Sequence, residues 1–202
     1  PQHRRQRQMC IRDRFITLPV IVLVSCLIYL EDKGPIFYTQ TRSGLNGKII
    51  KIIKFRSMHV NAEIDGIQWS KNNDKRITRI GRILRALRID ELPQLFCVLL
   101  GSMSLIGPRP ERPEIEKKLL KKVPYYKSRY ILKPGISGWA QVNYHYGASV
   151  SDTKQKLSYD IYYISNFSFF LDLLIFFKTI KLVLNAKGYK PKKIIDNNPN
   201  TN

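Results

Sequence analysis

The sequence has few acidic residues, few cysteines and no long apolar run. Only 15 residues are Asp or Glu, against 35 that are Lys or Arg. The three cysteines, Cys10, Cys26 and Cys97, lie far apart, are odd in number and form no C-x-x-C pair. This usage excludes a disulfide framework and the common zinc sites, and it is typical of a reducing compartment.

The surplus of basic residues gives a formal net charge of +20, which indicates anionic partners. Nucleic acid, anionic lipid and phosphate-bearing substrates all fit this charge, and composition does not choose among them. The 202 residues are 44% hydrophobic, which is enough for one domain with a real core but not for a second full domain.

The N-terminal region divides into two unlike parts. Residues 1–14 carry no apolar period, and we interpret them as a non-native leader, with a native basic arm as the alternative. Residues 15–30 carry no charge, but they are fewer than the roughly 20 that a spanning helix needs. Pro19 would bend a helix there. We therefore predict a re-entrant membrane helix over 15–33, with a buried core helix as the alternative.

The apolar spacing of the remaining chain predicts a mixed α/β, helix-rich domain. Strand-like runs on either side of a turn at 44–47 predict a small β-hairpin within 34–58. Helical patterns cover residues 77–87, 90–101, 111–122 and 167–184. The last helix carries three charges, so we expect it to be amphipathic and to lie in the membrane interface. The polar tail, 189–202, is expected to be disordered.

The stretch "RIDELPQL" places two adjacent acids, Asp90 and Glu91, behind a basic segment. Asp is a preferred N-cap, and the helix end together with Arg88 would favour its ionised form. An ionised Asp in a phosphate-attracting setting is a candidate nucleophile toward phosphorus, and Glu91 is a candidate ligand for Mg²⁺. A plain helix cap is the alternative interpretation.

Two further stretches carry candidate binding groups. In "SLIGPRPERP", Pro108 and Pro110 restrict the backbone around Arg109, whose guanidinium could grip a diphosphate. A rigid surface turn is the alternative. In "KPGISGWAQVN", Gln141 and Asn143 alternate along a piece that we expect to be extended, where they could bind a base or sugar edge.

Five stretches occur in one order: "KFRSM", "RIDELPQL", "SLIGPRP", "KPGISGWAQVN" and "YDIYYISNFSFFLDLLIFFKTI". With them the chain resembles the bacterial sugar transferases, that is, the monotopic polyprenyl-phosphate phosphoglycosyl transferases, in their exopolysaccharide-type branch. The likeness runs from about position 19 to 188. It implies one monotopic, membrane-associated catalytic domain over 34–188, on the cytoplasmic face of the bacterial inner membrane.

The resemblance also implies a reaction. A sugar 1-phosphate would pass from a UDP-sugar to undecaprenyl phosphate, giving undecaprenyl-diphosphate-sugar and UMP, with anionic lipid as a further partner and Mg²⁺ as cofactor. The motifs name neither the sugar nor an oligomeric state.

Residue roles follow from matching the family's motifs. Asp90 would carry a covalent phosphosugar, and Glu91 would bind or position Mg²⁺. Arg109 would hold phosphate, with Lys54 and Arg56 as helpers. Together with the residues named above, the residues predicted to bind substrate are Lys54, Arg56, Arg88, Arg109, Gln141 and Asn143. The family's re-entrant helix breaks at a Ser-Pro pair. Pro19 stands at that break, but Leu18 replaces the serine, and we interpret the chain as an N-terminally truncated catalytic domain.

Two other hypotheses stay open. The chain could be an inactive membrane-bound scaffold of the same fold, or a basic nucleic-acid-binding module. The second is motivated by the charge of +20 alone. It has no recognisable binding motif and leaves the apolar segments unexplained, so nucleic acid is not an expected partner.

Overall fold

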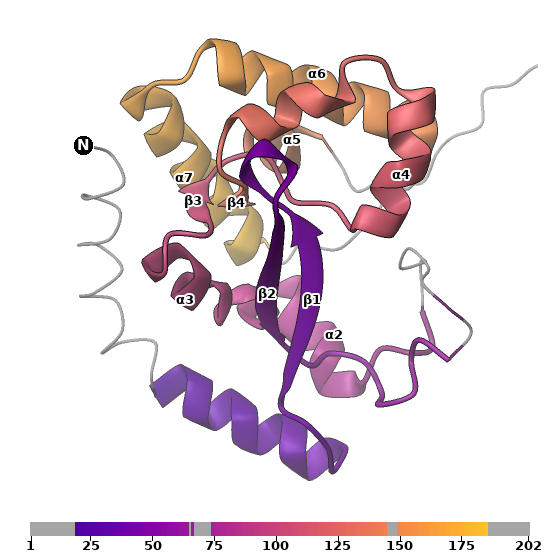
Figure 1. Ribbon diagram of the computed structural model, residues 1–202. Coiled ribbons are helices and arrows are strands. Elements are labelled where there is room, and N and C mark those ends of the chain that lie inside the picture. Colours follow the sequence, from indigo (N-terminus) through magenta and orange to yellow (C-terminus); the bar gives the residue numbers. More distant parts are fainter. Residues whose placement is uncertain (1–18, 65, 67–73, 145–148, 186–202) are drawn as a thin grey trace, which may run out of the picture.

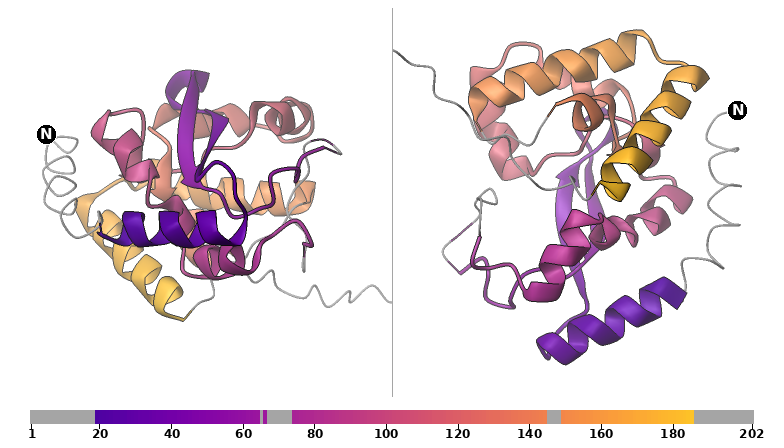
Figure 2. Two further views of the ribbon diagram at one scale, coloured as in Figure 1. Left: turned by 90° about the horizontal axis from the view of Figure 1, so that it is seen from below. Right: turned by 180° about the vertical axis from the view of Figure 1, so that it is seen from behind.

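The structure is a computed structural model, and it describes residues 19–64, 66, 74–144 and 149–185. A β-hairpin runs through the middle of the molecule with helices around it (Figure 1). The helix over residues 19–31 lies at one end, and α6 lies at the other end in both the front and the rear views (Figures 1 and 2).

The predicted mixed α/β, helix-rich class is confirmed. In chain order the elements are β1 Phe37–Ser43, η1 Leu45–Gly47, β2 Ile49–Phe55, α2 Arg79–Ala86, η2 Ile89–Glu91, α3 Gln94–Leu99, β3 Ser104–Ile106, α4 Pro113–Lys122, η3 Tyr126–Ile131, β4 Gly135–Ser137, α5 Trp139–Asn143, α6 Val150–Ser165 and α7 Phe169–Leu184. The hairpin and the helices predicted over 77–87, 111–122 and 167–184 correspond to β1–β2, α2, α4 and α7. The leader 1–14 and the tail 189–202 lie outside the described residues.

The hairpin is antiparallel, with Phe37 opposite Phe55 and Ser43 opposite Ile49. Its turn places Asn46 and Gly47 at φ values of 54° and 73°. Glycine and asparagine reach this left-handed region at little cost, which is why the chain reverses at this point. Residue Ile52 of β2 packs on Cys97 and Val98 of α3.

The helix over residues 19–31 is apolar all round but buries only one stripe. Val24 and Ile28, four residues apart, pack with Phe55 of β2 and Leu84 of α2. The carboxylate of Glu31 accepts hydrogen bonds from the first backbone N–H groups of α2, so the end of this helix holds the start of the next.

No helix among the described residues is long and apolar enough to cross a bilayer. Pro19 is the first described residue and opens the helix over 19–31. The bend predicted there involves residues 15–18, which lie outside the described part of the chain, so the re-entrant geometry stays a prediction.

A short parallel pair, β3 with β4, joins the middle of the chain to its C-terminal helices. Ser104 pairs with Gly135 and Ile106 with Ser137. A Cβ on Gly135 would lie 2.1 Å from the backbone nitrogen of Gly107, so only glycine permits this approach. The pair sits on α7, because Ile106 packs with Tyr163 and Ile175. It fixes the position of the loop that follows β3.

Candidate functional site

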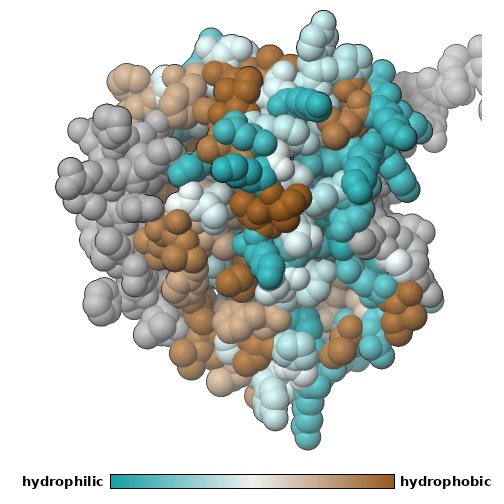
Figure 3. All heavy atoms as spheres, viewed as in Figure 1, coloured by the Kyte–Doolittle hydropathy of each residue, from teal (hydrophilic) through white to brown (hydrophobic). Residues whose placement is uncertain are grey.

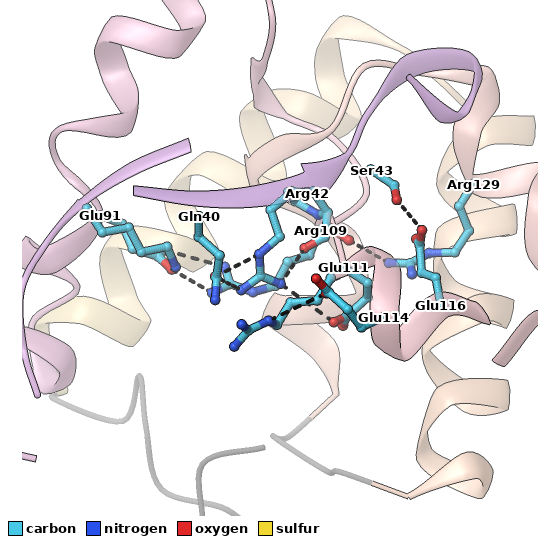
Figure 4. Close-up of polar contacts among 12 residues, drawn as sticks. Gln40, Arg42, Ser43, Glu91, Arg109, Glu111, Glu114, Glu116 and Arg129 are labelled. Atoms are coloured by element: carbon cyan, nitrogen blue, oxygen red, sulfur yellow. Dashed lines mark hydrogen bonds and ion pairs between the residues drawn. The ribbon is translucent and has the colours of Figure 1, made fainter. Parts of the chain in front are cut away.

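Three basic side chains meet at the buried carboxylate of Glu91. We call these four residues, which come from three segments of the chain, the Glu91 cluster: Lys54, Arg88, Glu91 and Arg109. Lys54 Nζ lies 3.0 Å from Glu91 Oε1, and Arg109 Nη2 lies 2.6 Å from the same oxygen. Nη1 of Arg88 and Nη1 of Arg109 each lie 3.4 Å from Oε2. Both oxygens of Glu91 therefore face cations. Figure 4 shows Glu91 beside Arg109.

The backbone brings Glu91 to this place through a turn between two helices. After α2 the chain enters the left-handed region at Arg88, with φ 54° and ψ 21°, and η2 follows at once. This conformation is uncommon for a residue with a side chain. It sets Asp90 and Glu91 side by side at 9% and 6% exposure.

The prediction that Asp90 caps a helix is wrong. Pro93 is the N-cap of α3, and Asp90 lies in the short η2 turn before it. Proline at that point needs no backbone N–H, so the regular helix starts later than the acid pair. The segment 90–101 is thus a 3₁₀ turn and a shorter helix rather than one helix.

The two neighbouring acids have opposite pKa shifts. Burial, together with the charge of Glu91, raises the pKa of Asp90 to about 6, although Lys54 nearby acts against it. Burial would also raise the pKa of Glu91, but Arg109, Lys54 and Arg88 outweigh it and hold that pKa well below its usual value. The expected lowering of the Asp90 pKa is therefore wrong, because the cations act chiefly on Glu91.

Arg109 reaches Glu91 from the Pro108–Pro110 turn, which directly follows β3. Its guanidinium makes two contacts with the carboxylate, which is the parallel geometry that an arginine also offers to a phosphate. The sequence predicted that Arg109 binds a diphosphate. In this structure its guanidinium binds the carboxylate of Glu91 instead.

The structure separates Lys54 from Arg56, which the sequence analysis grouped together as substrate-binding residues. Lys54 belongs to β2 and contacts Glu91, whereas β2 ends at Phe55. Arg56 hydrogen-bonds the backbone carbonyl of Asp32 and lies 3.5 Å from its carboxylate. Lys54 therefore belongs to the cluster, and Arg56 ties the hairpin to the N-terminal helix.

Gln141 and Asn143 lie in α5, so the prediction of an extended segment is wrong. Gln141 donates to the carbonyl of Ile136, and Asn143 accepts from Lys178 of α7 at 2.7 Å. Among the contacts of the described residues, neither side chain touches Asp90 or Glu91. Their predicted role in binding a base or sugar stays a prediction.

Sequence reasoning missed a second set of charged residues behind the turn. Arg129 of η3 donates to Asp160 of α6 and to the backbone carbonyl of Arg109, both at 2.8 Å. Arg42 of β1 donates to the carbonyl of Pro110 at 3.0 Å. The one available signal was Asp160 itself, an acid flanked by Leu157 and Tyr163 at helical spacing on an apolar face.

Glu91 is the metal ligand that the sequence predicted, and Asp90 is the carboxylate beside it. Across residues 19–64, 66, 74–144 and 149–185, no three His, Cys, Asp or Glu side chains gather as a metal site would. Mg²⁺ typically takes one or two carboxylates and completes its shell with phosphate oxygens and water, so the pair fits as part of a shared site. Glu91, with both oxygens on cations, is poorly placed to hold the ion by itself.

Known proteins match most of the chain. The family model described as "Bacterial sugar transferase" matches residues 10–186. A UDP-N-acetylgalactosamine-undecaprenyl-phosphate N-acetylgalactosaminephosphotransferase of Aeromonas hydrophila is 48% identical over 170 residues, 84% of this chain and 40% of that protein. An undecaprenyl-phosphate glucose phosphotransferase of Komagataeibacter xylinus is 41% identical over 169 residues, 81% of this chain and 32% of that protein.

A UDP-glucose:undecaprenyl-phosphate glucose-1-phosphate transferase of Caulobacter vibrioides is 40% identical over 170 residues, 83% of this chain and 64% of that protein. The chain thus spans less than two thirds of each of these three relatives.

Proposed function

The chain belongs to the bacterial sugar transferase family, and we propose that it transfers a sugar 1-phosphate from a UDP-sugar to undecaprenyl phosphate. The products are undecaprenyl-diphosphate-sugar and UMP. The observation that carries the proposal is the Glu91 cluster, where three cations converge on one buried carboxylate beside Asp90. The printed activities of the relatives supply the substrate class.

In the first step an oxygen of Asp90 attacks the phosphorus that bears the sugar. A new bond forms between that oxygen and phosphorus, the phosphorus–oxygen bond to UMP breaks, and UMP leaves with the electron pair. The attack requires the carboxylate, and a pKa of about 6 keeps Asp90 mostly ionised at neutral pH. The covalent acyl phosphate divides one difficult displacement into two easier ones.

In the second step a phosphate oxygen of undecaprenyl phosphate attacks the same phosphorus. The bond between phosphorus and Asp90 breaks, and the diphosphate linkage of the lipid product forms. Asp90 regains its carboxylate, so the protein is ready for another donor.

Arg109, Lys54 and Arg88 stabilise the negative charge of the phosphoryl groups during both steps. Preorganised cations in a buried site contribute strongly to such reactions, because they need no reorganisation when charge develops. Without substrate, Glu91 holds these three side chains in place. With substrate, the donor diphosphate shares them.

Mg²⁺ belongs to the proposal as a cofactor held by the pair Asp90 and Glu91 together with the donor diphosphate. When bound there, the ion neutralises charge on the phosphates. Because the oxygens of Glu91 already contact three cations, we expect the donor phosphates to supply the remaining ligands of the ion. We therefore expect weak binding of Mg²⁺ to the protein alone.

We place the protein on the cytoplasmic face of the bacterial inner membrane. Exposed apolar side chains support contact with a membrane surface: Phe170 is 81% exposed on α7, and Leu30 is 77% exposed on the helix over 19–31. Hydrophobic residues also gather on the lower left of the face in Figure 3, where hydrophilic ones are sparse. An interfacial position would cover such surface and bring Asp90 to a lipid phosphate.

The direct test is UMP release from UDP-N-acetylgalactosamine and UDP-glucose, each with undecaprenyl phosphate and Mg²⁺. We expect release with at least one donor, dependent on the lipid acceptor for repeated turnover and suppressed by EDTA. A folded protein that releases UMP from neither donor would favour the inactive scaffold. Salt-sensitive DNA binding without partitioning to lipid would favour the nucleic-acid module.

A further inference from the structure

The backbone of the Pro108–Pro110 turn, which carries Arg109, is held through its carbonyl groups. Its two prolines have no N–H to donate, so they cannot anchor the backbone in the usual way. Instead, the Pro108 carbonyl accepts from the backbone N–H of Gly135 at 3.0 Å. The Pro110 carbonyl accepts from Arg42 at 3.0 Å, and the carbonyl of Arg109 accepts from Arg129 at 2.8 Å. Three separate elements thus fix three successive carbonyls.

Arg129 makes the contact closest to the functional group, since it binds the peptide of Arg109 itself. Its guanidinium donates in three directions: Nε to Asp160 at 2.8 Å, Nη1 to the hydroxyl of Tyr126 at 2.6 Å, and Nη2 to the Arg109 carbonyl. The group also lies over the Tyr126 ring, 5.1 Å from its centre. Arg129 is therefore fixed on all sides.

Asp160 anchors Arg129 from the far side. The acid lies in α6 at 1% exposure, and the Arg129 side chain is only 9% exposed. Among the contacts of the described residues, neither side chain reaches the Glu91 cluster directly, and Arg129 is linked to it through the peptide of Arg109. Figure 4 shows Arg129 and Glu91 at opposite ends of the polar network, with Arg109 between them.

We propose that Arg129, held by Asp160, is a positioning residue that sets where the Arg109 guanidinium meets the donor diphosphate. This inference rests on the proposed function. Arg129 fixes the backbone at the residue whose side chain grips phosphate, and a shift of about 1 Å in such a group can cost about a hundredfold in rate. Arg129 acts through Arg109 and contributes no contact of its own to the substrate.

The test is a double-mutant cycle on UMP release, with kcat and KM measured for the donor. Arg129→Lys keeps the charge but loses the three-way geometry, and we expect kcat/KM to fall roughly 10- to 100-fold. In the Arg109→Gln background the same change should have almost no further effect, because the group that it positions is already gone. Arg129→Gln, which also removes the charge, should lower kcat/KM further than Arg129→Lys does.

Arg76→Lys is the matched control. Arg76 likewise donates to a carboxylate, that of Asp74 at 2.6 Å, and to a backbone carbonyl, that of Ala62 at 3.2 Å. It should leave kcat/KM within about twofold, since these contacts tie Arg76 to Asp74 and Ala62 rather than to the turn or the Glu91 cluster. Melting temperatures show whether each variant folds. If Arg129→Lys does not fold, the nearly isosteric Asp160→Asn tests the same positioning role.

The outcomes separate the two claims. If the unmodified protein releases no UMP from any donor, the proposed function fails before the cycle begins. If it is active, and a folded Arg129→Lys or Asp160→Asn variant keeps full kcat/KM, the positioning role is wrong. Equal losses from Arg129→Lys with and without Arg109 would also overturn it, because they would mean that Arg129 acts independently.

Discussion

Two buried groups of charged side chains flank the Pro108–Pro110 turn, and they are balanced differently. In the Glu91 cluster, three cations surround one carboxylate, and a second carboxylate, Asp90, lies beside it. Behind the turn, Arg129 faces Asp160, and its remaining donors bind a hydroxyl and a carbonyl. Arg109 joins the two, because its guanidinium lies in the first group and its carbonyl in the second.

This difference indicates that the Glu91 cluster can bind a substrate, whereas the pair of Arg129 and Asp160 stabilises the local structure. Cations in excess of their carboxylate partners can turn toward an incoming phosphate without leaving a bare buried charge. A matched pair cannot do so, since breaking it strands a buried ion at a cost of about 3–5 kcal/mol. The cations of the Glu91 cluster can thus exchange their carboxylate partner for a phosphate, whereas Arg129 and Asp160 stay paired.

Replacing the nucleophile should have the largest effect of all. Asp90→Asn preserves size and burial but removes the attacking oxygen anion, so we expect UMP release to fall by at least about a thousandfold. Glu114→Gln is the matched control, because this acid is half exposed and pairs with Arg112 outside the Glu91 cluster, and it should retain most activity. Turnover by Asp90→Asn at the unmodified rate would reject the assignment.

Arg109→Lys should follow with a loss of about a hundredfold in kcat/KM. Lysine keeps the positive charge, but it cannot make the two parallel hydrogen bonds that Arg109 makes with Glu91. Steady-state kinetics with varied donor measure the loss. A change of less than threefold would mean that charge alone matters at this position.

Lys54 and Arg56 offer a comparison between neighbouring cations. Lys54→Gln removes one cation from the Glu91 cluster, and we expect donor kcat/KM to fall about 10- to 30-fold. Arg56→Gln breaks the contacts with Asp32 instead. It should lower the free energy of unfolding by about 1–3 kcal/mol while changing kcat/KM less than Lys54→Gln. If both variants lost kcat/KM equally, Lys54 and Arg56 would both belong to the substrate-binding site, as the sequence analysis predicted.

The raised pKa of Asp90 predicts an acid limit to activity. Because the carboxylate must be unprotonated, the rate of the first step should fall as the pH drops through about 6, reaching about a tenth of its plateau near pH 5. Single-turnover UMP release across pH measures this limb. Glu91→Gln should move the limb to lower pH, since the Glu91 charge raises the Asp90 pKa. A movement to higher pH would contradict this cause.

Changes to the exposed apolar residues of α7 should have the smallest effect on the rate of UMP release. Replacing Phe169 and Phe170, which are 64% and 81% exposed, with serine should reduce partitioning to anionic vesicles about tenfold. Stability should not change, because both rings are largely in solvent. Tyr125→Ser, at an equally exposed aromatic with 82% exposure, is the control. Unchanged partitioning of the double variant would exclude α7 as a membrane contact.

Local sequence patterns predicted the parts of the fold that local forces determine. The hairpin follows from strand-like runs around Gly44–Gly47, and α2, α4 and α7 follow from helical spacing. The β3–β4 pair could not be predicted, because its strands have three residues each and lie about thirty positions apart in the sequence. The helix start was misplaced because Pro93, rather than Asp90, begins α3.

The site divides in the same way. Short motifs carry Asp90 and the four residues of the Glu91 cluster, so the sequence could name them. It could not show that Lys54, Arg88 and Arg109 meet at one carboxylate. The spacing around Asp160 could mark it as a buried acid, but nothing in the sequence pairs it with Arg129, because the two residues come from α6 and η3 and meet through tertiary packing. Opposite pKa shifts of adjacent acids likewise depend on which of them the cations reach.

The most direct measurement is intact-protein and peptide mass spectrometry after mixing the protein with UDP-sugar and Mg²⁺ in the absence of lipid. The account predicts one added sugar phosphate, located on the peptide that contains Asp90, with stoichiometric release of UMP and loss of the label when undecaprenyl phosphate is added. Transfer that occurs only with donor and lipid present together, on a protein that never carries the label, would contradict it.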